Sequence, residues 1–297
     1  MSKKRAAIDL GTNSFRMLIA EVEGVSFVPI TKDLHTVRLG EAFGDRHITE
    51  AAMDRGFEVL STFKQQLRRY HGIEIIACGT AVFRQAHNRD DFIKRAASFL
   101  GVTIRVLTPE QEAKLSRLGT LHGIDDECEN IITIDAGGGS TEISFADTKS
   151  SPAKTIGSRC SFISIPVCAV LLTEQHLGST VRSKANIAQL RLSAQHLIIK
   201  AFNNCKNSFA DHSPLLNVPP TLIASGGTAT ALACLDLNLS EYDEAKVHGH
   251  VLSRTTLTKL LTGLTGLSPQ QANALPGLDN RRGEIITAGL VILETLM

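Results

Sequence analysis

The sequence lacks three features that would assign it to a class at once: a large net charge, paired cysteines and a long hydrophobic run. Its 31 basic and 30 acidic residues leave a net charge of +1, which argues against wholesale electrostatic binding to nucleic acid or to an anionic membrane. The six cysteines form no CxxC pair, so neither a common zinc pattern nor a small disulfide framework is present, and a reducing compartment is indicated. An anionic ligand would therefore need a local site.

Targeting and anchoring patterns are missing as well. No apolar run reaches the roughly 18 residues that cross a bilayer. The opening stretch MSKKRAAIDLGTNS is basic at first but continues directly into a strand pattern, without the apolar region of a signal peptide. We therefore expect a cytoplasmic protein that binds no membrane. The 43% apolar and 21% charged residues are typical of a globular protein, and 297 residues suffice for two domains.

Hydrophobic periodicity predicts strands that alternate with helices, which is typical of an α/β architecture with mixed sheets. Short apolar runs predict strands at Arg5–Leu10, Met17–Val22, Ile73–Cys78, Ile104–Leu107, Ile131–Ile134 and Thr221–Ala224. Helical spacing of apolar residues predicts helices over 50–70, 90–100, 109–120, 183–202, 228–236, 255–264 and 283–296.

Two short stretches of the chain repeat one another. Ile8–Ser14 (IDLGTNS) and Ile134–Ser140 (IDAGGGS) share Ile, Asp, Gly and Ser at corresponding positions. Each follows an apolar strand pattern and precedes β-type residues, so both are predicted strand–turn–strand units. We infer that they open two related domains, 1–122 and 123–297, with the boundary in the polar stretch HGIDDECEN. The last helix is a candidate to pack back on the first domain.

Both turns carry residue types that suit a phosphate chain. Glycine lets backbone N–H groups approach a bound oxygen, and hydroxyls add further donors at Thr12, Ser14, Ser140 and Thr141. Three nearby acids would repel a bare phosphate: Asp9, Asp135 and Glu142. A Mg²⁺ ion bound by carboxylates, phosphate oxygens and water would reconcile acids and phosphate. The alternative is a pair of glycine-rich turns with solvated acids.

A third glycine cluster, ASGGTATALA at 224–233, follows a strand pattern and opens a helix. Gly226, Gly227 and Thr228 lie where the free N–H groups of a helix N-terminus bind anions. Close packing of a strand against a helix also favours small residues, so this cluster alone is compatible with either interpretation.

Charged residues outside the turns are further candidates. Glu112 lies in the first turn of the helix that begins at Pro109, where an acid is common because of the helix dipole. Its functional interpretation is a general base for a water that attacks phosphorus. Arg84 follows a strand and a turn, and it could contact phosphate oxygens or lie on a solvated helix edge. For Arg281 and Arg282, a local ion pair with an acid is the alternative to a ligand contact.

Taken together, these motifs resemble the exopolyphosphatase and guanosine pentaphosphate phosphohydrolase family. The matching stretches span nearly the whole chain in this order: AAIDLGTNSFRMLIAEV, GTAVFRQAHN, EQEAKLSRLG, IDAGGGSTEIS, ASGGTATALA and LPGLDNRRGEIITAGLVIL. The resemblance implies two duplicated RNase H-like domains of the actin, Hsp70 and sugar kinase superfamily, with a cleft between them. It also implies a short form without the C-terminal helical region of longer members, and a homodimer by analogy.

The resemblance assigns roles to individual residues. Glu112 matches the catalytic glutamate that activates water, and Arg84 matches an arginine that the family presents toward the cleft. Asp135 and Glu142 match acids that organise the metal and the terminal phosphates, with Asp9 as a further metal ligand. The implied metal is Mg²⁺, with Mn²⁺ as the alternative. The implied phosphate-binding residues are Gly11, Thr12, Asn13, Ser14, Gly137, Gly138, Gly139, Ser140, Thr141, Gly226, Gly227 and Thr228.

We therefore predict an exopolyphosphatase that hydrolyses the terminal phosphoanhydride of inorganic polyphosphate. A guanosine pentaphosphate phosphohydrolase would use the same residues and stays an alternative. A kinase of the superfamily would need a second substrate, and a non-catalytic binder of polyphosphate or alarmone would have no need of Glu112. The chain departs from the family at Cys168 and Leu171, and it has Thr108-Pro109 where Ser-Gly is common. These departures concern the substrate channel and the start of the Glu112 helix.

Overall fold

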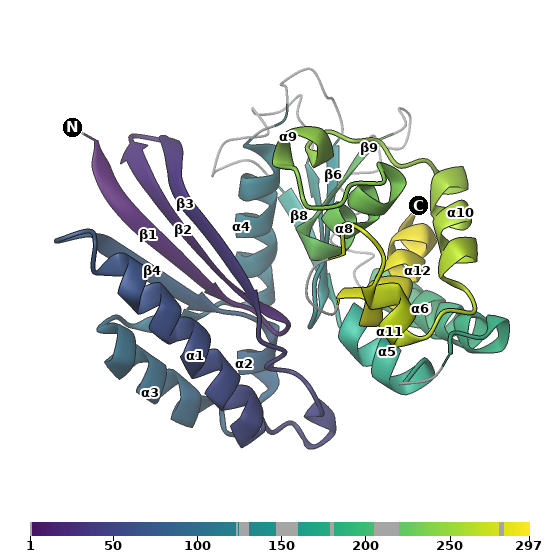
Figure 1. The fold of residues 1–297 in the computed structure, drawn as a ribbon, viewed down its shortest axis with the longest axis horizontal. Helices are drawn as coiled ribbons and strands as arrows, with labels where there is room; N and C mark the ends of the chain where they lie inside the picture. The colour runs from purple at the N-terminus through teal and green to yellow at the C-terminus, as the bar shows by residue number, and fades with distance from the viewer. Residues whose placement is uncertain are drawn as a thin grey trace. The chain divides into compact units, whose positions relative to one another are not determined.

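The computed structural model describes residues 2–122, 124, 131–146, 160–178, 181–204, 220–278 and 282–297. They form two compact units, Met1–Thr108 and Pro109–Met297, each built on one mixed β-sheet (Figure 1). No helix in this described part of the chain is both long enough and apolar enough to cross a membrane.

The first unit contains a five-stranded sheet in the order β3-β2-β1-β4-β5. β1 and β2 form an antiparallel hairpin that β3 extends, while β4 runs parallel to β1 and β5 parallel to β4. The strands are β1 (Lys3–Leu10), β2 (Ser14–Glu23), β3 (Ser26–Thr36), β4 (Glu74–Gly79) and β5 (Ile104–Val106). The helices are α1 (Glu50–Leu67), α2 (Ala81–Gln85) and α3 (Arg89–Leu100), with a 3-10 turn η1 (Phe43–Asp45).

One face of this sheet is buried under the helices of the unit. Along β1 the buried side chains alternate with more exposed ones, so Ile8 points into the core and Asp9 points to the opposite face. Helices α1, α2 and α3 contribute Phe63, Phe83 and Phe92 to the same core. Asp9 and the turn that follows it are therefore carried by a sheet whose other face is firmly packed.

The second unit contains a four-stranded sheet in the order β8-β7-β6-β9. Here too a hairpin, β6–β7, is extended by an antiparallel strand on one side and flanked by a parallel strand on the other. The strands are β6 (Ile131–Ala136), β7 (Thr141–Ala146), β8 (Cys160–Ile165) and β9 (Thr221–Ser225). The helices are α4 (Pro109–Leu121), α5 (Ala169–His176), α6 (Lys184–Asn204), α8 (Gly226–Asp236), α9 (Glu244–Val247), α10 (Arg254–Leu264), α11 (Pro269–Asn273) and α12 (Ile286–Leu296), with a 3-10 turn η3 (Arg282–Glu284).

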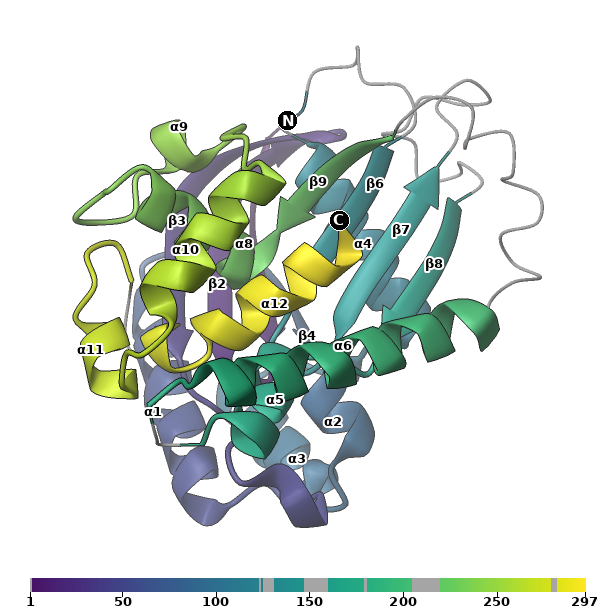
Figure 2. The same ribbon diagram turned by 90° about the vertical axis from the view of Figure 1, so that its right-hand side faces the viewer.

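Helices cover both faces of the second sheet. On one face α5, α6, α8, α10 and α12 pack over a hydrophobic core that includes Ile134, Ile143 and Ile163 (Figure 2). On the other face α4 contacts β6, β7 and β8. In α12 every residue from Ile286 to Glu294 is buried, so this helix is a central part of the core of the second unit.

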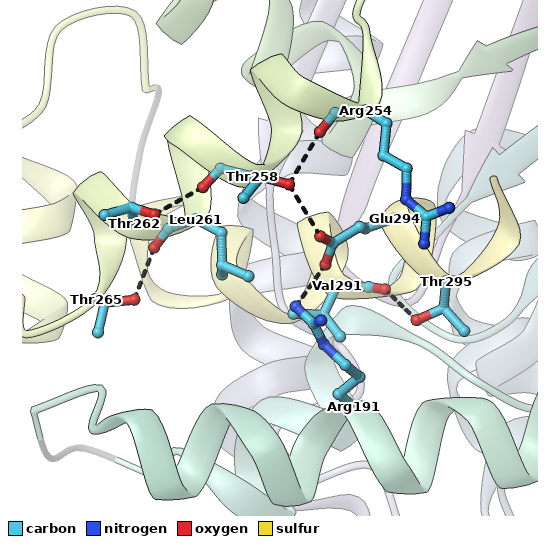
Figure 3. A network of polar contacts seen from close by, with 9 residues as sticks. All are labelled: Arg191, Arg254, Thr258, Leu261, Thr262, Thr265, Val291, Glu294 and Thr295. Carbon is cyan, nitrogen blue, oxygen red and sulfur yellow. Dashed lines mark hydrogen bonds and ion pairs between the residues drawn. The ribbon is translucent and has the colours of Figure 1, made fainter.

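One buried carboxylate joins three of these helices (Figure 3). Arg191 of α6 donates to Glu294 Oε2 of α12 at 2.6 Å, and the Thr258 hydroxyl of α10 lies 3.4 Å from Glu294 Oε1. The Thr258 hydroxyl has a single proton and also lies 3.1 Å from the Arg254 carbonyl oxygen, so Arg191 is the main partner of the carboxylate. The cluster holds α6, α10 and α12 together over the core.

The strands and helices expected from hydrophobic periodicity are confirmed, with small shifts at their ends. The edge strands β3 and β8 were not expected, and neither were the short helices α2, α5, α9 and α11, because such segments show no clear period. The units divide after Thr108, ahead of the expected boundary at 122, because α4 packs on the second sheet. Of the polar stretch HGIDDECEN, only His122 and Ile124 are among the described residues.

Candidate active site

The two hairpin turns have the same backbone hydrogen bond. The Gly11 N–H donates to the Ser14 carbonyl at 3.1 Å, and the Gly137 N–H donates to the Ser140 carbonyl at 3.0 Å. A Cβ on Gly11 would lie only 2.7 Å from the Ser14 carbonyl oxygen, so this turn requires glycine at its first position. The repeated sequence pattern therefore encodes the same turn twice, as the internal repeat predicted.

A row of four polar residues crosses the second sheet next to its turn. Strand pairing places Ser164 opposite Glu142, Glu142 opposite Asp135, and Asp135 opposite Ser225. Paired residues on adjacent strands point to the same face, so these four side chains lie side by side. The row thus consists of two acids flanked by two hydroxyls.

Glu142 is the deeply buried acid of this row. It is 4% exposed and accepts hydrogen bonds from Ser140 Oγ at 2.6 Å and from Ser164 Oγ at 2.9 Å. Burial raises its pKa first, and the neighbouring carboxylates of Glu112 and Asp135 raise it further. The serine hydrogen bonds oppose this effect, and the resulting pKa is about 8. At neutral pH this carboxyl group therefore retains its proton unless a cation compensates the negative charge.

Helix α4 adds polar side chains to the same face of the sheet. Ser116 Oγ donates to Asp135 Oδ2 at 2.6 Å. Glu112 precedes Ser116 by one helical turn, and its carboxylate helps to raise the pKa of Glu142. The predicted base and the two predicted metal ligands of this unit therefore interact with one another.

Four residues beside these acids were not predicted: Ser116, Arg117, Ser164 and Ser225. Arg117 is 2% exposed and donates to Ser144 Oγ at 3.1 Å. Ser116 follows Glu112 by four positions, which places it on the same side of a helix, so the period of α4 contained a signal for Ser116 but not for Arg117. Ser164 had no such signal, because only strand pairing brings β8 to the hairpin.

Some hydroxyls predicted to bind phosphate instead donate hydrogen bonds to backbone carbonyls of the protein. Thr141 Oγ1 donates to the Val167 carbonyl at 2.8 Å, and Thr228 Oγ1 donates to the Ala136 carbonyl at 3.2 Å. By contrast, Ser225 Oγ is buried and has no hydrogen-bond partner within the described structure. A buried hydroxyl without a partner is uncommon, so Ser225, which was not predicted from the sequence, is a candidate donor to a ligand.

The third glycine cluster begins α8 directly beside the acids. Gly226 has φ +83°, and a Cβ there would lie 2.5 Å from Asp135 Oδ1. A Cβ on Gly227 would lie 1.9 Å from Arg282 Nη1, so the guanidinium packs against the backbone of this glycine. Arg282 is thereby placed at the N-terminus of α8, where a cation and free N–H groups favour an anion. Arg281 lies outside the described residues.

A buried arginine holds the segment that carries Arg282. Arg182 is 1% exposed and donates to the carbonyls of Leu267 at 3.2 Å and Glu284 at 3.1 Å, as well as to the Gly283 carbonyl. Burial lowers the pKa of Arg182, but an arginine stays protonated in proteins. Its hydrogen bonds therefore fix η3 and keep Arg282 beside α8.

The turn of the first unit has a different electrostatic setting. Asp9 lies opposite Arg16 across the hairpin and opposite Cys78 on β4. The Asn13 carbonyl accepts the Val37 N–H at 2.9 Å, which fixes the turn against the chain that follows β3. Thr12 Oγ1 is buried and, like Ser225 Oγ, has no hydrogen-bond partner within the described structure.

Arg84 lies in the first unit, near the end of the sheet that carries the turn. The Thr80 N–H donates to the Leu10 carbonyl at 3.2 Å, and α2, which contains Arg84, begins at the next residue. Arg84 Nη1 donates to the Leu107 carbonyl at 3.0 Å. One nitrogen of the guanidinium therefore anchors the end of β5.

The acids of the second unit fit a divalent cation that is bound partly by substrate and water. Among the described residues, no three His, Cys, Asp or Glu side chains form a group that could hold a metal ion alone. Mg²⁺ commonly uses one or two carboxylates together with phosphate oxygens and waters. Asp135 and Glu142 are adjacent, and burial, together with the charges of Glu112 and Asp135, raises the pKa of Glu142. Asp9, the third predicted ligand, belongs to the first unit.

The family departure at Cys168 has a structural role. Cys168 Sγ accepts the Leu171 N–H at 3.4 Å and so caps the N-terminus of α5. Burial raises the pKa of the thiol to about 11, which keeps it protonated and unreactive. Cys168 therefore serves as the N-cap of α5 and adds no chemistry to the site.

Known proteins resemble this chain over nearly its full length. The model of the Ppx/GppA phosphatase family matches residues 18–297. A bifunctional 3-dehydroquinate synthase/phosphatase of Fusobacterium nucleatum is 28% identical over 303 residues, covering 99% of this chain but only 43% of that protein. Exopolyphosphatase 2 of Mycobacterium tuberculosis is 26% identical, covering 98% of this chain and 89% of that protein. This chain thus spans less than half of the first relative and most of the second.

A solved structure agrees with these matches. The crystal structure of an exopolyphosphatase-like protein superimposes with a TM-score of 0.87 at 25% identity, covering 99% of this chain and 87% of that one. The expected fold class is confirmed: the chain has the α/β fold of the actin-like ATPase and RNase H-like superfamily, with the same hairpin-based sheet in each unit.

Proposed function

Because the chain belongs to the Ppx/GppA phosphatase family, we propose that it is an exopolyphosphatase, which hydrolyses the terminal phosphoanhydride of inorganic polyphosphate and releases orthophosphate. The observation that carries this proposal is the interaction of three carboxylates in the second unit, Glu112, Asp135 and Glu142. Acids that repel one another beside glycine turns are expected where a cation and a phosphate chain bind together.

Glu112 is the proposed general base. It would accept a proton from the water that attacks the terminal phosphorus, while the bond from that phosphorus to the bridging oxygen breaks. The released products are orthophosphate and a chain shorter by one phosphate. Arg84 is proposed to contact phosphate oxygens, as the resemblance to the family implies.

Asp135 and Glu142 are the proposed protein ligands of Mg²⁺, with Mn²⁺ as the alternative. The bound ion would neutralise charge on the phosphate oxygens. Ser116 and Ser164 hold the two carboxylates in place by hydrogen bonds. Since the pKa of Glu142 is about 8, this residue must release a proton when it binds the cation at neutral pH.

The glycine turns and the start of α8 are proposed to hold the terminal phosphates. Backbone N–H groups of both turns and of Gly226–Gly227 would donate to phosphate oxygens. Two buried hydroxyls without partners in the described structure, Thr12 Oγ1 and Ser225 Oγ, would find acceptors in phosphate oxygens. Arg282, which packs on Gly227, would add positive charge at this point.

The test is phosphate release by the purified protein with Mg²⁺, compared across long polyphosphate, triphosphate, guanosine pentaphosphate and ATP. We expect release from long polyphosphate that vanishes in Glu112→Gln. Release from guanosine pentaphosphate alone would transfer the proposal to the phosphohydrolase alternative, which uses the same residues. Release from none of them would refute both. The proposal includes a homodimer, by analogy with the family, and light scattering on the purified protein measures its mass.

A further inference from the structure

A cavity of about 540 Å³ lies in the first unit, at the end of β1 opposite to the glycine turn. It is formed by the start of β1 and by the connection from α1 to β4. The charged and aromatic residues that line it are Lys3, Lys4, Arg69, Tyr70, His71 and Glu74. None of these residues belongs to the site described above.

The cavity is strongly basic for a protein of nearly neutral charge. Two lysines, an arginine and a histidine line it together with a single acid, Glu74. That acid is bound by Arg5, whose Nε lies 2.8 Å from Glu74 Oε2, so its charge is compensated by a residue that does not line the cavity. Since the whole chain has a net charge of +1, this concentration of cations is a local feature.

The fold accounts for only part of this concentration. Arg69 follows the C-terminal end of α1, where basic residues interact favourably with the helix dipole. Lys3 and Lys4 come from a strand, which has no comparable dipole. Lys4 Nζ lies 5.5 Å from the centroid of the Tyr70 ring, which keeps its charge at the cavity. Cations from two separate elements thus converge on one concave surface.

We propose that this cavity is a second phosphate-binding site, which holds a distal part of the same polyphosphate chain whose end is hydrolysed. The inference rests on the proposed function, because it takes the same substrate. The eight residues of β1 separate the cavity from the glycine turn by roughly 25 Å. A ligand that reaches both must be long and anionic along its whole length, which fits long polyphosphate and excludes triphosphate and nucleotides.

A second contact on the same chain raises affinity through effective concentration. The cavity is therefore expected to give the protein a preference for long over short polyphosphate. Because that preference arises from Lys3, Lys4 and Arg69, it weakens with rising salt in proportion to the number of phosphates that these residues neutralise.

The composition of the chain offers a direct probe of the cavity. The protein has no tryptophan and only two tyrosines, so Tyr242→Phe leaves Tyr70 as the single tyrosine. In the double variant Tyr242→Phe with Glu112→Gln, which is designed not to turn over, we expect long polyphosphate to change the fluorescence of Tyr70. Titration of this signal gives the affinity of the cavity without any hydrolysis.

The variant Lys4→Ala with Arg69→Ala, in the same background, should weaken binding of long polyphosphate by about fivefold or more and reduce its salt dependence. The matched control, Lys94→Ala with Lys200→Ala, removes two exposed cations that do not line the cavity. It should change the affinity by less than about twofold, as expected for general surface charge.

Three outcomes would overturn the inference. The Tyr70 signal could fail to respond to long polyphosphate, or both pairs of variants could weaken binding equally. Triphosphate, GTP or a single-stranded RNA could also bind as tightly as long polyphosphate, which would make the cavity a site for a different ligand. If Tyr70 responds as expected while the wild-type protein releases no phosphate, the proposed function fails and this binding site stands.

Discussion

The two hairpins share one turn but differ in the residue that faces the aspartate. In the first sheet Asp9 pairs with Arg16, whereas in the second sheet Asp135 pairs with Glu142. Opposite charges stabilise a cross-strand pair, while like charges raise the pKa of one partner, as they do for Glu142. The same fold therefore provides one turn whose aspartate lies opposite a cation and one whose aspartate lies opposite a second acid. We expect the first to contribute mainly to phosphate binding and the second to hold the cation and the chemistry.

The largest expected effect tests whether the second unit carries the chemistry. Glu112→Gln should lower the turnover of polyphosphate by about 10²–10⁴-fold, because the attacking water loses its base, while binding is retained. Initial rates of phosphate release and equilibrium binding measure the two quantities separately.

The matched control is Glu110→Gln, which removes an exposed acid from the same helical turn. Its activity should stay within about twofold of the wild type. Equal losses in both variants would show that the helix start, and not the carboxylate of Glu112, is required.

The charge difference between the hairpins also predicts a dependence of stability on pH. Between pH 4.5 and about 8 the folded protein keeps the Glu142 proton that the unfolded chain has lost, so the stability falls as pH rises through this window. Glu142→Gln should remove this fall and be the more stable protein at pH 8. The upper limit of the gain is several kcal/mol, since one pKa unit corresponds to about 1.4 kcal/mol.

Urea unfolding of both proteins at pH 5, 6.5 and 8 measures this effect. The two curves of stability against pH should converge at low pH and separate at high pH. Curves that remain parallel would contradict the assignment of the proton to Glu142.

An intermediate effect is expected from the contact between Gly227 and Arg282 within the second unit. Gly227→Ala places a Cβ within 1.9 Å of Arg282 Nη1, so the guanidinium must move. We expect a loss of about 1–3 kcal/mol in the free energy of unfolding, together with weaker polyphosphate binding. Thermal unfolding and a binding titration measure both.

The control is Gly119→Ala in α4, where a Cβ would meet nothing within 4 Å. This variant should be equal to the wild type or more stable by up to about 1 kcal/mol, because alanine favours a helix. The double variant Gly227→Ala with Arg282→Ala should recover stability but not polyphosphate binding. Recovery of both would show that Arg282 does not bind the ligand.

The smallest effects should come from the two buried hydroxyls, one in each unit. Thr12→Val and Ser225→Ala each remove a group that has no hydrogen-bond partner in the described protein. Stability should be unchanged or slightly higher, whereas polyphosphate binding should weaken by about 1 kcal/mol, the usual contribution of one hydrogen bond. Isothermal titration detects this difference, and unchanged binding in either variant would remove that hydroxyl from the proposed site.

Local sequence signals were sufficient for much of this architecture. The paired turns, their acids and Glu112 each lie in a short contiguous motif, and the helices follow from apolar spacing. Ser164 and Ser225 could not be found in this way, because only strand pairing brings them to Asp135 and Glu142. The division into compact units after Thr108 could not be found in this way either, because α4 precedes the polar stretch in sequence but packs on strands that follow it.

The burial of individual side chains could not be predicted from the sequence either. The raised pKa of Glu142 depends on its 4% exposure and on Glu112, and neither follows from the residues around position 142. The contact of Arg282 with Gly227 depends on a buried arginine about a hundred positions earlier, Arg182. Such effects arise from packing between distant segments, which periodicity and spacing do not encode.

The burial of α12 has a consequence for synthesis of the protein on the ribosome. The first unit is complete at Thr108, so its core can close while the rest of the chain is still being translated. The core of the second unit requires Ile286–Glu294, so its sheet stays partly uncovered until these residues have emerged. During that interval the apolar face of β6–β9 is exposed, and this half of the nascent chain is the one that depends on protection from aggregation.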